Sequence, residues 1–198
     1  MQLVSYNAVV PPDSTETKRR LADAARAEFS EFGLAGARVD RIAERANANK
    51  RSIYMHFGTK EELFDLTVAA SLVELADAVP FDVRDIPAYA GRLYRTLQGS
   101  PDIFRLTSWA LLERPRPLDT EMASYREKVD AIREAQRDGI LSTEHDPATL
   151  VAMIIALVTS WDHASWSLRA VAGDDAPENR QEDVEVAVRK LVTVTPRA

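Results

Sequence analysis

The chain has no cysteine, three histidines and seven glycines among its 198 residues. The absence of cysteine excludes disulfide bonds, thiol catalysis and cysteine-ligated metals, and it is typical of a reducing compartment. The longest wholly apolar run, Leu150 to Val158, has nine residues, whereas a membrane-spanning helix needs about 20. The first residues contain no basic stretch followed by an apolar one, as a signal peptide would. We therefore expect a cytoplasmic protein without membrane contact, whose residues 1–14 form a disordered tail.

The few histidines and glycines also argue against an enzyme. His56, His145 and His163 belong to no Glu-x-x-His pair of the kind that helical di-iron proteins use, and no glycine-rich phosphate loop is present. Ser160, Asp162 and His163 would lie on one helix, where adjacent side chains point apart and cannot form a catalytic triad. We expect no catalytic residues, no metal and no cofactor.

The net charge of -6 is unevenly distributed along the chain. Residues 13–60 contain ten Lys or Arg and seven Asp or Glu, whereas residues 61–198 contain fifteen and twenty-four. A basic segment attached to an acidic remainder suits a protein that contacts phosphate at one end only. An imbalance of this size also arises by chance, so charge alone does not establish nucleic-acid binding.

Apolar residues recur at helical spacing along the chain, and no segment alternates as a half-buried strand would. Thr15 or Thr17 can cap a first helix, and Gly33 can end it. Later helices are predicted over residues 87–98, 101–113, 119–138, 147–168 and 178–194. The predicted fold is all-α with about nine helices, comprising a three-helix head over residues 15–60 and a helical bundle over residues 61–198.

Two short helical patterns lie close together in the head. Asn49 is the predicted N-cap of the second, and Ile53 and Phe57 are its predicted buried pair. Thr59 and Glu62 form a capping box at the start of a longer helix, which must end by Pro80. A linker of only about three residues between the two short helices is typical of a helix-turn-helix.

The outward face of the helix after Asn49 carries cationic, aromatic and hydroxyl side chains. At about 100° per residue, Arg51 and Met55 lie opposite Ile53. Lys50 and Arg51 occupy the first turn, the end at which recognition helices usually meet base edges. Arg and Lys can pair with guanine N7 and O6, whereas Tyr, Ser and His can donate to phosphate. A solvated helix face fits the same residue types, but the short spacing favours DNA recognition.

Residues 27–64, with the sequence AEFSEFGLAGARVDRIAERANANKRSIYMHFGTKEELF, resemble the TetR family of bacterial transcriptional regulators. The combination IYMHFGTKEEL after an IAERA helix carries the resemblance. It implies a helix-turn-helix head on a domain for ligand binding and dimerisation. It also implies a homodimeric repressor that leaves a palindromic operator when a small molecule binds. An activator or effector-independent regulator of this fold is the alternative, and a helical protein-binding adaptor is a remote one.

The resemblance also implies roles for individual side chains on double-stranded DNA. Positions in the first turn of the recognition helix would approach bases, and later ones would hold phosphates. The assigned residues are Thr17, Arg38, Asn49, Lys50, Arg51, Ser52, Tyr54, His56 and Lys60. Arg38 could reach phosphate or the minor groove, although a solvated side chain fits equally well.

Two positions depart from the family pattern. Asn47 stands where members commonly have glycine in the turn, and asparagine tolerates the left-handed conformation better than most residues. Ala37 and Arg38 stand where a Thr or Ser is common before the second helix. The expected hydroxyl cap is therefore missing at these two positions. Both departures affect the operator sequence and leave the predicted fold unchanged.

The later helices are predicted to supply an effector pocket and a dimer interface. Aromatic and apolar walls with a few polar tips suit a small-molecule cavity. The pocket candidates are Tyr94, Phe104, Trp109, Leu112, Met122, Tyr125, Trp161, His163 and Trp166. The resemblance places the interface on the last two long helices, across a two-fold axis. The interface candidates are Leu150, Ile154, Leu157, Val158, Trp161, Val184, Val188 and Leu191.

The sequence leaves alternatives open for both sets. Each pocket candidate also suits an ordinary core position, and the last two helices could pack within one chain only. Asp162 and His163 interrupt an apolar helical pattern, and unpaired polar groups are costly to bury. They could orient a ligand, cross the dimer interface or face water.

Overall fold

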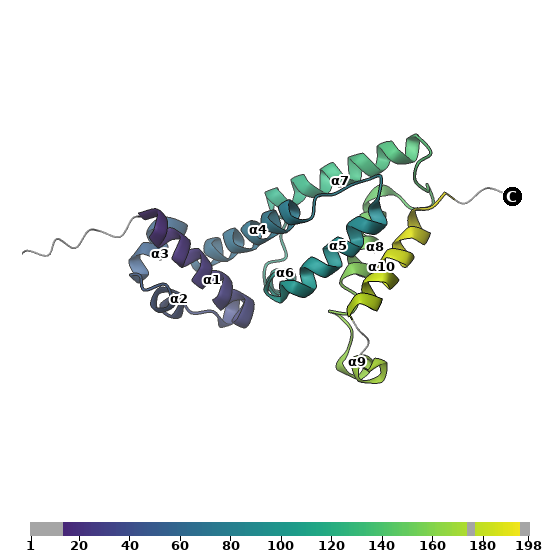
Figure 1. The fold of residues 1–198 in the computed structure, drawn as a ribbon. Helices are drawn as coiled ribbons and strands as arrows, with labels where there is room; N and C mark the ends of the chain where they lie inside the picture. Colours follow the sequence, from purple (N-terminus) through teal and green to yellow (C-terminus); the bar gives the residue numbers. More distant parts are fainter. Residues whose placement is uncertain (1–13, 174–176, 195–198) are drawn as a thin grey trace, which may run out of the picture. The chain divides into compact units, whose positions relative to one another are not determined.

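The computed structural model describes residues 14–173 and 177–194, and the described residues are helical with no strand. Residues 1–13, most of the predicted disordered tail, lie outside these ranges. The helices are α1 (Ser14–Gly36), α2 (Val39–Arg45), α3 (Lys50–Phe57), α4 (Lys60–Ala78), α5 (Ile86–Gly99), α6 (Pro101–Glu113), α7 (Asp119–Arg137), α8 (Pro147–Val158), α9 (Trp166–Ala172) and α10 (Pro177–Val192) (Figure 1). The all-α prediction is confirmed, with ten helices in the described ranges instead of about nine.

The chain divides into two compact units, Met1–Thr67 and Val68–Ala198, and the boundary falls inside α4. None of the helices in the described ranges has the length and apolar character needed to cross a membrane.

The first unit contains α1, α2, α3 and the start of α4 around a small apolar core. Phe29 of α1 and Phe64 of α4 are fully buried and meet edge to face, with ring centroids 5.1 Å apart. Ile42 of α2 and Ile53 of α3 are also fully buried. An edge-to-face aromatic pair contributes about 0.5–1.5 kcal/mol beyond the burial of its area. The helices of the predicted head therefore share one core.

Helix α1 differs from its predicted limits at both ends. It begins at Ser14, so Thr15 and Thr17 lie inside its first turn and do not cap it. Gly33 has φ 67° and interrupts the helix where the sequence predicts, but helical structure resumes as far as Gly36.

The capping box before α4 is confirmed. Thr59 N donates to Glu62 Oε2 at 2.7 Å, and Glu62 N donates to Thr59 Oγ1 at 3.1 Å. Two amide groups that the helix itself cannot satisfy are paired in this way. Helix α4 ends at Ala78, before Pro80, as predicted.

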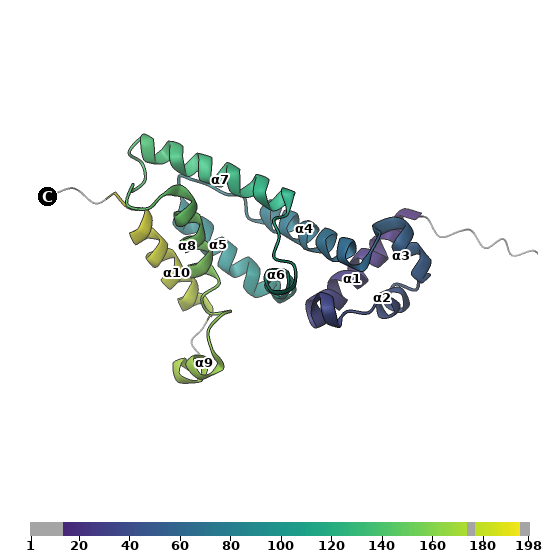
Figure 2. The same cartoon turned by 180° about the vertical axis from the view of Figure 1, so that it is seen from behind.

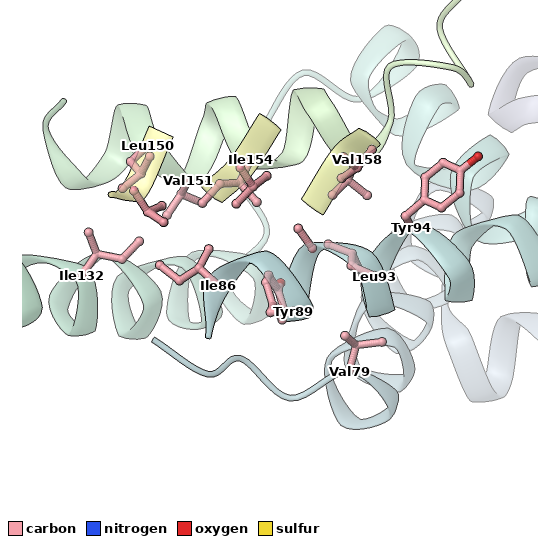
Figure 3. Close-up of a cluster of buried hydrophobic side chains, with 14 of the residues drawn as sticks. Val79, Ile86, Tyr89, Leu93, Tyr94, Ile132, Leu150, Val151, Ile154 and Val158 are labelled. Carbon is pink, nitrogen blue, oxygen red and sulfur yellow. The ribbon is translucent and has the colours of Figure 1, made fainter. Parts of the chain in front are cut away.

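The second unit is a helical bundle around one apolar cluster. Helices α5, α8 and α10 pack against one another, and α7 packs against α8. Figures 1 and 2 show α8 and α10 side by side from opposite directions. Side chains of α5 and α8, including Leu93 and Ile154, face each other in the cluster (Figure 3). Ile132 of α7 belongs to the same cluster.

The prediction of one helix over residues 147–168 is wrong, because α8 ends at Val158 and α9 begins at Trp166. Polar side chains after Val158 bond back to carbonyl groups of the same stretch. Thr159 Oγ1 donates to Ile155 O at 2.9 Å, and Ser160 Oγ donates to Leu157 O at 2.8 Å. Such bonds let Thr and Ser compete with continued helix. Ser165 then caps α9, since its Oγ accepts from Leu168 N at 3.2 Å.

Candidate nucleic-acid interface

The turn between α2 and α3 depends on Asn47, whose φ of 46° lies in the left-handed region. The conformation supports the interpretation that Asn47 takes the place of a turn glycine. Ala48 N donates to Ala43 O at 2.9 Å, which closes the turn. Asn49 Oδ1 accepts from Arg51 N at 2.8 Å, so the predicted N-cap of α3 is confirmed. These bonds hold the first turn of α3 in a defined orientation to α2.

One face of α3 is buried and the opposite face is open. Ile53 is fully buried, whereas Tyr54 is 50% and Met55 is 71% exposed. Arg51 is exposed, and no ion pair holds its guanidinium within the part of the chain that the structure describes. His56 is half-buried, with its ring 6.2 Å from that of Phe57. The open face thus carries a cation and a phenol on a capped helix.

Lys50 is paired within the protein. Its Nζ lies 2.8 Å from Asp40 Oδ1 of α2, and both side chains are largely exposed. The hydrogen bond between them raises the pKa of Lys50 and holds the pKa of Asp40 below its usual range. A phosphate approaching Lys50 would therefore meet a carboxylate beside the ammonium group. Lys50 is less available for DNA than its position in the sequence indicates.

Replacing Asp40 by Asn should strengthen DNA binding. The change removes the negative charge that pairs with Lys50, so the ammonium group is held less strongly within the protein. One additional phosphate contact corresponds to about fivefold higher affinity at 0.15 M salt and to a slope of log affinity against log salt that is steeper by about one. Fluorescence anisotropy across a salt series measures both quantities. Glu44→Gln, which removes an exposed carboxylate from the same helix, is the control, and an unchanged slope in Asp40→Asn would contradict the interpretation.

Glu28 of α1 is a residue that supports the start of α2 and that the sequence reasoning missed. It is fully buried, and its Oε1 accepts from Arg38 N at 2.8 Å and from Arg41 Nε at 2.7 Å. The amide group of Arg38, the N-cap residue of α2, is therefore satisfied by a side chain from another helix. The Arg38 side chain itself makes no cap hydrogen bond. The sequence contains one indication that Glu28 is buried, because it lies seven residues after Leu21, on the apolar stripe of α1.

The remaining predicted DNA contacts come from three elements. Lys60 Nζ of α4 donates to Ala37 O at 3.2 Å, so it holds the loop before α2. Arg38 is exposed at the start of α2. Thr17 Oγ1 accepts from Arg20 at 3.5 Å, and the neighbouring Lys18 places its Nζ 5.9 Å from the centre of the Phe57 ring. The start of α1 therefore lies beside the end of α3.

An open hollow in the first unit has a basic lining that was not predicted. It has a volume of about 240 Å³ and is lined by Arg19, Arg20, Asp23, Ala24 and Arg45. Arg19 is paired with Glu16 and Asp23, which reduces the free positive charge there.

The nine residues predicted for an effector pocket are not gathered into one cavity. Met122 and Tyr125 line a shallow hollow of about 320 Å³ on α7, together with Arg126, Val129, Asp130 and Arg133. The other seven candidates do not line it. Leu112 is 75% and Trp166 is 83% exposed, so neither is enclosed.

Four of the pocket candidates make contacts within the second unit. Tyr94 is buried and has a hydrogen bond with Arg180, and burial is the main cause that raises its pKa. The Arg180 guanidinium lies 4.1 Å from the centre of the Trp161 ring. The His163 ring lies 5.1 Å from the ring of Phe104, which is half-buried like Trp109.

Asp162 and His163 lie in the turn between α8 and α9, not on a helix. Gln98 Nε2 donates to Asp162 at 3.3 Å, and His163 Nδ1 lies 3.0 Å from Thr159 O. Both side chains therefore have partners within the chain. In the part of the chain that the structure describes, no cluster of acidic, histidine or cysteine side chains could hold a metal ion.

Most of the predicted interface residues lie in the core of the second unit. Leu150, Ile154, Val158, Val184 and Val188 are at most 4% exposed, because α5, α8 and α10 pack on one another. Leu157, Trp161 and Leu191 are half-buried. Five of the eight predicted interface residues are therefore buried within the chain, and the exposed surface of α8 and α10 is formed mainly by other positions.

Two sequence models of known families match the chain. Residues 21–67 match the model described as bacterial regulatory proteins, tetR family, and residues 85–190 match the model described as tetracyclin repressor-like, C-terminal domain. The second match alone spans more than half of the chain. The two segments lie on the head and the bundle that the structure describes.

Known proteins are similar over nearly the whole length. The HTH-type transcriptional repressor SCO4008 of Streptomyces coelicolor is 33% identical, over 91% of this chain and 97% of its own. The crystal structure of SCO4942 from the same organism has a TM-score of 0.79 at 33% identity, over 92% of this chain and 99% of that one. The structure of TylP, a TetR regulator from Streptomyces fradiae, shares the fold, with a TM-score of 0.64 at 20% identity over 92% and 89% of the two chains.

Proposed function

The chain belongs to the TetR family of bacterial transcriptional regulators, and from this premise we propose that it is a homodimeric repressor that binds a palindromic operator. Its family and its relatives are regulators and not enzymes. As a regulator of bacterial genes it would act in the cytoplasm. Repression is chosen over activation because the relative at 33% identity is a repressor.

The exposed face of α3 is the observation that carries the proposed DNA contact. Asn49 caps the helix and the turn at Asn47 positions it, so Arg51 is presented from its first turn without an ion-pair partner in the described residues. A helix N-terminus also offers free amide groups to phosphate. We propose that Arg51 reads a base edge in the major groove, and that Tyr54 and His56 contact the backbone.

A homodimer is supported by the outer face of α8. The helix contains no charged residue from Pro147 to Val158. Its outward positions are small or apolar, with Ala152 and Ala156 exposed and Met153 36% exposed. An uncharged exposed face along a whole helix is typical of a surface that another protein covers. We propose that α8 and α10 form a four-helix bundle with their copies in a second chain.

Effector response is also proposed. Trp161 and Tyr94 surround Arg180, whose Nε is buried without a hydrogen-bond partner among the described residues. A ligand with an aromatic or apolar body and one acceptor group would match this cluster. An effector that binds one arrangement of the dimer better than another would lower operator affinity by its difference in binding free energy. Helix α4, which runs from one unit into the other, is the proposed connection.

Selection from a random pool of duplex DNA tests the proposed function. We expect enrichment of an inverted repeat whose half-sites are separated by whole helical turns, with two chains bound per duplex. Affinity for the selected duplex should fall steeply with salt, because phosphate contacts release counterions. Enrichment of no sequence would overturn the proposal, and a salt-independent affinity would exclude phosphate-anchored binding.

A further inference from the structure

The exposed side of α10 carries an ordered pattern of charge. The outward positions of this helix are Asn179, Glu182, Asp183, Val186, Arg189, Lys190 and Thr193, all of them exposed. Val186 is 44% exposed and is the apolar residue at the centre of this stripe. The two acidic residues come four and three positions before Val186, and the two basic residues come three and four positions after it. The pattern is thus symmetric in position and opposite in sign about Val186.

These charges are not paired within their own chain. Ion pairs along a helix form between residues three or four positions apart. The acidic and basic residues of the stripe are at least six positions apart, which corresponds to about 9 Å or more along the axis. Within the described residues, no ion pair involves Glu182, Asp183, Arg189 or Lys190. All four side chains are exposed, so they are available to pair with the surface of another molecule.

A second copy of α10 supplies that surface in one orientation only. A two-fold axis at right angles to the helix and beside Val186 makes the two copies antiparallel. Glu182 and Asp183 of each copy then face Arg189 and Lys190 of the other. A parallel arrangement would instead place like charges opposite each other, which is unfavourable. The charge pattern therefore fits a second copy in antiparallel orientation.

We infer that the α10 stripe sets the register and the partner choice of the homodimer, with Val186 on the two-fold axis. This inference rests on the proposed homodimer and adds to it which residues meet. The uncharged outer face of α8 would provide apolar contact, and the charges of α10 would select a second copy of this chain over related chains with another charge order. Like-charge repulsion provides the discrimination, as in other self-selecting helical interfaces.

Charge exchange between the two ends of the stripe tests the inference. One variant carries Glu182→Lys and Asp183→Lys, so its stripe is entirely basic. Another carries Arg189→Glu and Lys190→Glu, so its stripe is entirely acidic. We expect each variant alone to self-associate about 100-fold more weakly than the original chain. An equimolar mixture of the two should form a heterodimer, and one chain with all four changes should again form a homodimer.

Sedimentation equilibrium and native mass spectrometry measure these species. Because all four side chains are exposed, circular dichroism should show unchanged helix content. The double variant Glu127→Lys, Glu134→Lys on α7 has the same change in net charge as the basic variant and should remain a dimer. Repulsion within each charge-altered variant should weaken as salt rises, since salt screens exposed charges.

The outcomes separate the inference from the proposed function. If both charge-altered variants dimerise as tightly as the original chain, or if their mixture forms no heterodimer, the register is wrong while the homodimer stands. If the original chain is itself a monomer at high micromolar concentration, the proposed homodimer fails and the register fails with it.

Discussion

Arg51→Ala should weaken operator binding by about 1–3 kcal/mol at each half-site and relax the base preference at the position that Arg51 contacts. In a homodimer both half-sites lose the contact, so the total effect on the operator reaches about 2–6 kcal/mol. The physical reason is the position of the residue. Arg51 lies in the first turn of a helix whose cap and turn are held by hydrogen bonds, and its guanidinium is exposed. Truncation therefore removes a preorganised contact without disturbing the core.

The experiment for Arg51 requires both affinity and sequence preference. The selection from random duplexes should be repeated with Arg51→Ala, and competition titrations should compare the selected operator with single-base variants. Lys60→Ala is the matched comparison, because it should weaken all sequences similarly and reduce the salt slope by about one. Thermal melting of both variants is needed, since Lys60 also donates to Ala37 O. An unchanged selected motif in Arg51→Ala would show that this residue does not read bases.

Glu28→Leu should destabilise the first unit by about 2–3 kcal/mol. The change removes the buried carboxylate and leaves its two hydrogen-bond donors without an acceptor. Arg38 N and Arg41 Nε both donate to Glu28 Oε1. The Arg41 side chain is 37% exposed and can regain part of its hydration, which places the cost below that of a fully buried ion pair. The start of α2 would lose its support, so affinity for every DNA sequence should fall together.

Glu28→Gln distinguishes the charge from the hydrogen bonds. An amide oxygen can still accept from Arg38 N and Arg41, and the amide nitrogen would replace Oε2, which has no partner among the described residues. We expect Glu28→Gln to cost about 1 kcal/mol, less than Glu28→Leu. Urea denaturation measures both values, and Glu44→Gln on the exposed side of α2 is the control. Equal stability of Glu28→Leu and the original chain would exclude the structural role assigned to Glu28.

Local sequence patterns predicted those parts of the molecule that depend on neighbours in the chain. The capping box of Thr59 and Glu62 and the cap at Asn49 need only a few adjacent residues, and both are confirmed. The left-handed conformation at Asn47 follows from the residue type and the turn length. The stop of α8 at Val158 was missed because an apolar run predicts a helix, whereas the hydroxyl groups that follow it end the helix.

The faces of the later helices could not be assigned from periodicity alone. Leu150, Ile154, Val184 and Val188 form clear apolar stripes, and such a stripe fits either a core or a dimer interface. The structure buries these side chains within the second unit. The charges that remain on the outer side of α10, and the uncharged outer side of α8, became informative only once the inner sides were known.

The amino-acid sequence by itself determined the all-α fold, the helix-turn-helix and its resemblance to the TetR family, because each depends on spacing and caps within short segments. The tertiary structure alone decided the partners of two charged groups in the first unit. Lys50 meets Asp40, and Glu28 meets Arg41, across separations of ten and thirteen residues. Periodicity shows which side of a helix is apolar, but it does not show which helix lies against it. The availability of Lys50 for DNA and the support of α2 by Glu28 are both consequences of that packing.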